Sequence, residues 1–190
     1  MDIFKNFLLQ TLELPVEDVE SCTNGLSHHN FEKNQFIVSP GNISGYAYFV
    51  NKGVLRMYSI DTGGKEHIIQ FAPEWWILSD RRSTYLNEPS MFYIQAVEDS
   101  EVVFIKKGFM EEIIKTYPTS AAKTTMILNR HIMLMQHRVN LLLSATAEER
   151  YLDFLTTYPG FINRVPLYMI ASYLGITPES LSRVRSELSR

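Results

Sequence analysis

The sequence predicts an α+β fold with a β-rich N-terminal domain, one long helix and a small helical C-terminal domain. Three patterns support this prediction. Short apolar runs separated by turn residues fill about 31–107, and apolar residues recur at heptad spacing over 118–143. Residues 161–190 have the pattern of two short helices joined by a tight turn. The predicted domains are therefore a sensor domain with flanking helices at 1–117, a dimerisation helix at 118–143 and a DNA-binding domain at 144–190.

Composition and charge limit the classes of protein that need to be considered. The chain has 190 residues, 45% hydrophobic and 21% charged, so it can bury a core without disulfides or metals. Its single cysteine, Cys22, excludes an intramolecular disulfide and a cysteine-ligated iron–sulfur cluster. No apolar run is long enough to span a membrane and the N-terminus lacks a signal-peptide pattern, so we expect a cytoplasmic protein with no membrane contact.

The elements before the long helix fall into two blocks. Residues 1–27 are expected to be helical. The following block contains short strands bounded by turn signals such as Asp61-Thr62-Gly63-Gly64, and its predicted strands are 35–38, 46–51, 54–60, 67–71, 92–97 and 101–106. Many short strands at regular spacing, without βαβ alternation, predict a small sandwich or barrel.

The long helix carries two apolar rows. One forms a heptad seam of Thr125, Leu128, Ile132, Met135, Val139 and Leu142. The other, on a different face, consists of Ile127, Leu134 and Leu141. We expect one row to pack on the β-rich domain and the seam to pack on a second copy in a homodimer. The alternative is a helix buried on both sides within one monomer.

The C-terminal pattern is that of a helix-turn-helix. The first helix places Ile170, Ala171 and Leu174 on one face. Gly175 supplies the left-handed residue that ends this helix. Thr177 is a good N-cap, and Pro178 suits the first position of the second helix.

The second helix is expected to bury Leu181, Val184 and Leu188 and to present a polar face to DNA. The predicted contact residues are Thr177, Glu179, Ser180, Ser182, Arg183 and Ser186. Arg183 can pair with guanine, and Glu179 can accept from cytosine N4 or orient the arginine. The net charge is −3 overall, but the four arginines and two glutamates of 161–190 make that segment positive. The alternative is an ordinary helical hairpin with a solvated face.

An enzyme with a metal site in the β-rich domain is the functional class with the weakest support. A metal site in a jelly-roll needs about three or four converging ligands. Of the five histidines, only His67 lies in a predicted strand. A glycine-rich phosphate loop, a nucleophile elbow and a Cys/His dyad are absent from the sequence. We therefore expect no catalysis, no metal and no cofactor.

The chain resembles the cyclic-AMP receptor protein/FNR family of bacterial transcription regulators over nearly its whole length. The resemblance is carried by 48–56, where a glycine turn joins two strands, and by 171–183 in the helix-turn-helix. It implies a cyclic-nucleotide-binding-type β jelly-roll, a dimerisation helix and a DNA-binding domain. It also implies that Glu179 and Arg183 occupy base-contacting positions.

Two departures from the family pattern qualify this resemblance. Pro73-Glu74 stands where nucleotide binders have Gly-Glu, and Ser90 stands where they have an arginine. Loss of that charge-assisted bond costs about 1.5–3 kcal/mol, so we expect an unidentified small effector rather than cyclic AMP. The candidate pocket residues are Glu74, Arg81, Arg82 and Ser90. In addition, the wing that follows the recognition helix in many relatives is short or absent, unless 161–165 supplies its only strand.

These observations predict a homodimeric regulator that binds a pseudo-palindromic operator in double-stranded DNA. RNA polymerase is a further candidate partner. The alternative is a signal-binding or protein-interaction module with a degenerate DNA-binding tail.

Overall fold

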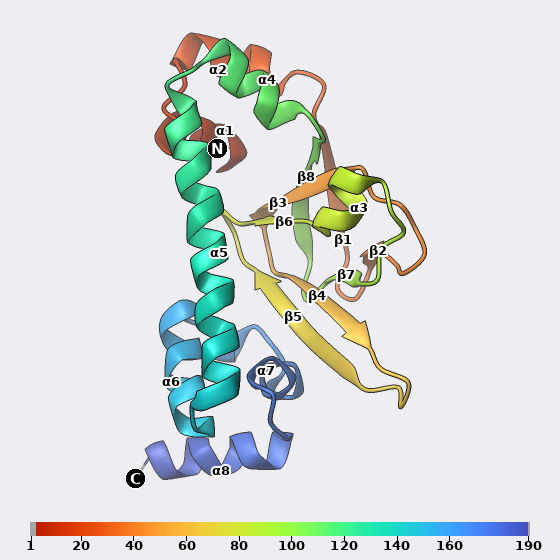
Figure 1. Ribbon diagram of the computed structural model, residues 1–190, viewed down its shortest axis with the longest axis vertical. Coiled ribbons are helices and arrows are strands. Elements are labelled where there is room, and N and C mark those ends of the chain that lie inside the picture. Colours follow the sequence, from red (N-terminus) through yellow and green to blue (C-terminus); the bar gives the residue numbers. More distant parts are fainter. Residues whose placement is uncertain (1–2, 190) are drawn as a thin grey trace. The chain divides into compact units, whose positions relative to one another are not determined.

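The computed structural model describes residues 3–189, which contain two four-stranded sheets that form a β-sandwich (Figure 1). The strands are β1 (Ser27–Phe31), β2 (Phe36–Val38), β3 (Tyr46–Lys52), β4 (Leu55–Ile60), β5 (Glu66–Ala72), β6 (Ile77–Leu78), β7 (Tyr93–Ala96) and β8 (Ser100–Lys106). One sheet has the order β1-β8-β3-β6 and the other β2-β7-β4-β5. The predicted α+β fold is confirmed, and of the two predicted architectures the sandwich is the one found.

The helices lie before, within and after the sandwich in the sequence. They are α1 (Ile3–Gln10), α2 (Val16–Thr23), α3 (Arg81–Leu86), α4 (Phe109–Thr116), α5 (Ser120–Ser144), α6 (Ala147–Thr157), α7 (Leu167–Leu174) and α8 (Pro178–Leu188), with a 3₁₀ turn at Phe161–Asn163. The long helix predicted over 118–143 is α5. Of the helices in the described part of the chain, none combines the length and hydropathy needed to cross a bilayer.

Contacts divide the chain into two compact units. The sheet unit comprises residues up to Met57 together with Phe71–Asn129. The helix-turn-helix unit comprises Tyr58–Gln70, from the hairpin of β4 and β5, together with residues from Arg130 onward. These units group residues by contact and interrupt the chain order, so the domain boundaries predicted at 117/118 and 143/144 stay a prediction.

The core of the sheet unit explains why β3 reads as a continuous apolar run. Phe4 and Phe7 of α1 pack on Phe49, with ring centroids 5.0 and 5.2 Å away. Tyr48 and Val50, which alternate with Phe49 along the strand, are also buried. Both faces of β3 are therefore covered, one of them by the N-terminal helices.

Several elements were not expected from the sequence. Strand β1 (Ser27–Phe31) has mostly exposed residues at the edge of its sheet, so it lacks the apolar alternation that marks a strand. Strand β6 has only two residues. The short helix α3 depends on one cap, because the Asp80 side chain accepts hydrogen bonds from the amides of Arg82 and Ser83.

The turn between β3 and β4 requires glycine at position 53. Gly53 has φ of 92°, and a Cβ there would lie 2.8 Å from the carbonyl oxygen of Asp99. Gly53→Ala therefore adds a steric clash to the backbone strain, and we expect it to lower the free energy of unfolding by about 2–4 kcal/mol. Urea unfolding followed by the fluorescence of Trp75 and Trp76, both in the sheet unit, measures this loss.

Gly41→Ala is the matched control within the same unit. Gly41 has φ of 87°, but a Cβ there meets no atom within 4 Å. It should cost only the strain of about 1–2 kcal/mol. Equal losses for the two variants would show that close packing around Gly53 is unimportant.

Candidate nucleic-acid interface and effector region

The two C-terminal helices form a helix-turn-helix within their unit. Figure 1 shows α7 nearly end-on while α8 lies across the view. Ile170, Ala171 and Leu174 of α7 and Leu181 and Val184 of α8 are buried, as their spacing predicted. Leu188 was also predicted to be buried, and that prediction is wrong. It is 42% exposed because it is the last residue of α8, beyond the buried Leu181 and Val184.

The turn between the helices is built as the sequence indicated. Gly175 takes the left-handed conformation, with φ of 68° and ψ of 33°. Its amide donates to the carbonyl of Ser172 at 3.1 Å, and the Ile176 amide donates to that of Ala171 at 3.0 Å. These bonds end α7 sharply and start the chain toward α8.

The beginning of α8 has a complete N-terminal cap. Thr177 is extended, with ψ of 157°, and its hydroxyl oxygen accepts from the amide of Ser180 at 3.2 Å. Pro178 occupies the first turn, as predicted. The Thr177 hydroxyl donates to Ser180 Oγ at 3.2 Å. The backbone amide of Glu179, and after it the nearby Thr177 hydroxyl, lower the pKa of the Glu179 carboxyl. Glu179 therefore stays an anion and an acceptor at neutral pH.

The residues predicted to read DNA lie together on α8. Glu179, Ser182, Arg183 and Ser186 are exposed, and at 100° per residue they fall within about 100° of one another. Thr177 is exposed at the start of this face, whereas Ser180 is half-buried at its edge. The sequence thus predicted a polar face that the structure leaves open. The individual DNA contacts stay a prediction.

Helix α6 supports the helix-turn-helix from one side. Thr146 and Glu149 form a capping box at its start, with the Thr146 amide donating to the Glu149 carboxylate at 2.7 Å. Its Phe154 ring lies 5.5 Å from that of Tyr173 in α7, and Tyr158 meets Tyr173 edge-on at 5.6 Å. This aromatic cluster fixes α7 against α6.

The four candidate pocket residues are each engaged by a different neighbour, and their role as a ligand pocket stays a prediction. The Glu74 carboxylate accepts from the Gly53 amide at 2.9 Å, and Arg82 forms an exposed ion pair with Glu88. The Arg81 guanidinium lies 4.7 Å from the ring centroid of Tyr85, and the buried Ser90 hydroxyl donates to the carbonyl of Phe92 at 2.9 Å. Two cavities of about 600 and 400 Å³ lie elsewhere in the sheet unit, and none of the four residues lines them.

Two polar features of this region were missed in the sequence. Helix α3 is fastened to β3: Ser83 Oγ accepts from the Ser44 amide at 2.7 Å, and Thr84 Oγ1 donates to the Tyr46 carbonyl at 3.0 Å. In addition, the buried Arg56 donates to Gln95 Oε1 from Nε at 2.9 Å. An arginine inside an apolar strand was the available signal for this second feature.

Metal ligation finds no support in the described residues. No group of three or more His, Cys, Asp or Glu side chains within 3–189 is arranged to hold a metal ion. His28 and His29 lie on β1, and His67 on β5 pairs with Asp61 at 2.7 Å.

The seam of α5 is the more exposed of the two predicted apolar rows. Its aliphatic members Leu128, Ile132, Val139 and Leu142 are 39–56% exposed, Thr125 is exposed and Met135 is half-buried. The second row, Ile127, Leu134 and Leu141, is half-buried, and Ile127 packs against the core of the sheet unit. The two rows therefore differ in environment, as a helix with one intramolecular face and one free face would.

The cap at Thr177 predicts a pH-dependent contribution to the stability of the helix-turn-helix unit. Thr177→Ala removes the acceptor for the Ser180 amide and the hydroxyl beside Glu179, so we expect a loss of about 1 kcal/mol of stability and a rise in the pKa of Glu179 toward its ordinary value. The native pKa is depressed, so the stability that ionised Glu179 confers is complete above its unfolded-state pKa. It is lost as the pH falls through the depressed value.

Thermal unfolding and carboxyl-carbon NMR titration measure these two effects. Thr177→Ser keeps the hydroxyl and is the control, which should match the wild type in both measurements. An unchanged pKa of Glu179 in Thr177→Ala would contradict the role given to the Thr177 hydroxyl.

Comparison with known proteins agrees with this architecture. The sequence model of the cyclic nucleotide-binding domain family matches residues 28–117. Over 186 residues the chain is 28% identical to the transcriptional activator protein anr of Pseudomonas aeruginosa, covering 91% of this chain and 75% of that protein. It is 26% identical to the nitrogen fixation regulation protein FixK of Bradyrhizobium diazoefficiens, covering 85% of this chain and 71% of the relative.

Solved structures show the same fold. FixK2 from Bradyrhizobium japonicum superposes with a TM-score of 0.72 at 22% identity, covering 86% of this chain and 84% of that one. The catabolite activator protein of Thermus thermophilus gives a TM-score of 0.57 at 21% identity, covering 96% and 86%. With the sandwich, the long helix and the helix-turn-helix all in place, the chain is similar in sequence and in fold to regulators of the cyclic-AMP receptor protein/FNR family.

Proposed function

We propose that this protein is a sequence-specific DNA-binding transcription regulator of the bacterial cytoplasm. The observation that carries the proposal is the exposed polar face of α8, formed by Glu179, Ser182, Arg183 and Ser186 on a helix with a complete N-terminal cap. The relatives named anr and FixK are themselves regulators, which supports the same role here and gives no indication of an enzyme.

Each residue of the face has a role that its chemistry suits. Arg183 donates two parallel hydrogen bonds to guanine, and the ionised Glu179 accepts from cytosine N4 or orients Arg183. Thr177 and the N-terminus of α8 bind a backbone phosphate. Ser180, Ser182 and Ser186 add shorter contacts along the groove.

The active form in this proposal is a homodimer built on the α5 seam. An exposed row of aliphatic side chains along a helix is unfavourable in a monomer, and a second copy of the same row would cover it. Two-fold symmetry then requires a pseudo-palindromic operator with half-sites about one helical turn apart.

The sandwich acts as the sensor in this proposal. Its effector is an unidentified small molecule other than cyclic AMP, because Ser90 stands where nucleotide binders have an arginine. Of the two nearby arginines, Arg82 pairs with Glu88 and Arg81 lies over the ring of Tyr85. Transcription activation by relatives such as anr also makes RNA polymerase a proposed partner.

Selection from random duplex DNA tests the proposed function. We expect a pseudo-palindrome, and Arg183→Ala should then lose about 1–3 kcal/mol at one base position of each half-site. Arg185→Ala is the control of equal charge on the same helix, where Arg185 is half-buried outside the exposed face. It should weaken binding uniformly. Failure to select a palindrome, or unchanged base preference in Arg183→Ala, would rule out the proposal.

The dimer is tested by placing a charge in the seam. Ile132→Glu should convert the dimer to a monomer in sedimentation equilibrium, because it buries an unpaired carboxylate in an apolar interface. Arg130→Glu places the same side chain about 200° away on α5 and should leave the dimer intact. A wild-type chain that sediments as a monomer at micromolar concentration would contradict the proposal that the seam is a dimer interface.

A further inference from the structure

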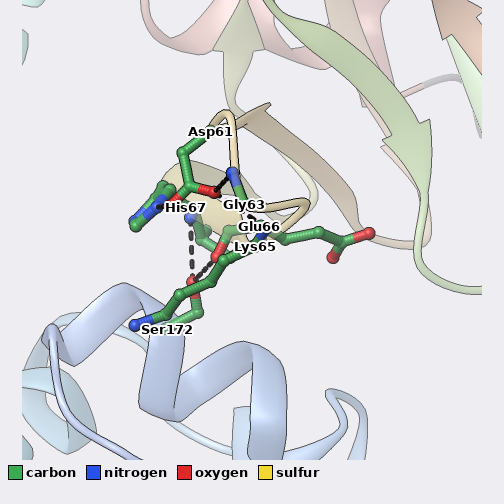
Figure 2. Close-up of polar contacts among 7 residues, drawn as sticks. Asp61, Gly63, Lys65, Glu66, His67 and Ser172 are labelled. Carbon is green, nitrogen blue, oxygen red and sulfur yellow. Dashed lines mark hydrogen bonds and ion pairs between the residues drawn. The ribbon is translucent and has the colours of Figure 1, made fainter.

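The free edge of β5 is occupied by a side chain of the helix-turn-helix. Strand β5 ends its sheet, so on one side its backbone has no neighbouring strand. The Ser172 hydroxyl fills that place: it donates to the Glu66 carbonyl at 2.8 Å and accepts from the Ile68 amide at 3.1 Å. Figure 2 shows Ser172 reaching from α7 toward Glu66. All of these residues belong to the helix-turn-helix unit.

Arg138 of α5 binds the same strand, β5, and also the C-terminal end of α7. Its Nη1 donates to the Ile69 carbonyl at 2.7 Å, and its Nη2 donates to the carbonyls of Ile68 at 2.8 Å and Tyr173 at 2.9 Å. The guanidinium also lies 4.1 Å from the ring centroid of Tyr173. One planar group therefore holds two neighbouring carbonyls of β5 and one of α7.

The charge on Arg138 is balanced by backbone dipoles. Among residues 3–189 no carboxylate lies within ion-pair distance of it, and burial lowers its pKa. The Tyr173 carbonyl belongs to the last turn of α7, where the helix dipole favours a cation. All three hydrogen bonds of Arg138 described here go to backbone carbonyls. They therefore depend on the positions of the β5 and α7 backbones.

The end of α7 is the part of the motif that aims α8. Its last two carbonyls, those of Tyr173 and Leu174, accept from Arg138 and from Arg150 Nη1, the latter at 2.8 Å. A Cβ on Gly175 would lie 3.1 Å from Leu142 Cδ2, so the turn also packs tightly on α5. The orientation of α8 therefore follows from contacts made at this turn.

We propose that Arg138 is a positioning residue for DNA recognition. Together with Ser172 it forms a clasp, defined by their hydrogen bonds to residues 66–69 and to the Tyr173 carbonyl. The clasp holds the turn of the helix-turn-helix to β5. Strands β4 and β5 have residues in both units, so a shift of this hairpin would be transmitted through the clasp to α8. This inference rests on the proposed DNA-binding function.

Hydrogen exchange in the free protein tests the clasp without DNA. Arg138→Gln and Arg138→Lys should speed amide exchange in peptides spanning 66–70 and 171–176 by about tenfold, because lysine cannot donate from both ends of a planar group. Ser172→Ala should speed exchange in 66–70, and Arg130→Gln, an exposed arginine on the same helix, should change neither peptide. Unchanged exchange in both Arg138 variants would overturn the clasp.

Specific and non-specific DNA affinity separate positioning from simple stability. Arg138→Gln should weaken binding to the selected operator by about tenfold and change binding to random duplex by less than about twofold, because phosphate contacts tolerate a tilted recognition helix better than base contacts do. The Arg130→Gln control should match the wild type in both. Equal losses on both DNAs, together with a lower melting temperature, would show a merely structural role and defeat the proposal.

The milder Ser172→Ala variant keeps the test valid if Arg138→Gln folds poorly. It should weaken operator binding alone, and in the double variant the two losses should combine to less than their sum. Full additivity contradicts a shared clasp. A wild-type chain that selects no operator defeats the proposed function, while the exchange measurement still decides whether the clasp exists.

Discussion

The constraint that organises the helix-turn-helix unit is the need to satisfy the backbone groups at the end of α7. A helix leaves its last carbonyls without intrahelical partners, and a strand at the edge of a sheet leaves one row of amides and carbonyls open. Here the two needs are met together. Arg138 binds carbonyls of both elements, and Ser172 bonds to the open edge of β5. The junction thus adds polar contacts at the start of the recognition helix to the apolar packing of α7 and α8.

Helix α5 places exposed apolar residues of the seam directly beside Arg138, which contacts β5 and α7. Val139 and Leu142 are exposed on the seam, whereas Arg138, one position before Val139, is largely withdrawn from solvent. Residues one apart lie about 100° apart around the helix, so the seam and the clasp face different partners. The heptad spacing that leaves an apolar row exposed is therefore compatible with a half-buried arginine on the same turn of the helix.

Local signals account for what could be predicted from the sequence. Gly175, Thr177 and Pro178 act through their own backbone preferences, so the turn and the cap were found from spacing alone. The heptad rows of α5 were found in the same way. Strand β1 and helix α3 were missed because their sequences, SHHNF and RRSTYL, are polar and their formation depends on a neighbouring strand and on the Asp80 cap.

The contacts of the clasp and of the sensor region join residues that no local sequence pattern links. Ser172 meets Glu66 across 106 positions, and Arg138 meets Ile69 across 69. The four candidate pocket residues show the opposite case, since they follow one another closely in sequence but each is engaged by a different group. The family resemblance predicted a site there, whereas the partner of each side chain depends on the fold.

The position of Arg138 next to the seam gives the proposed dimer a route to the DNA-reading helix. Hydrogen bonds weaken steeply once the donor angle falls below about 120°, so a rotation of α5 large enough to turn the guanidinium away would break its three bonds. Any effector that changes how two seams pack would rotate Arg138 with them. In this proposal the clasp is either made or broken, and a differential affinity of about 1–3 kcal/mol between the two arrangements would shift operator binding by about 5–150-fold. The proposed coupling between sensor and DNA then acts through Arg138, which holds the turn before α8.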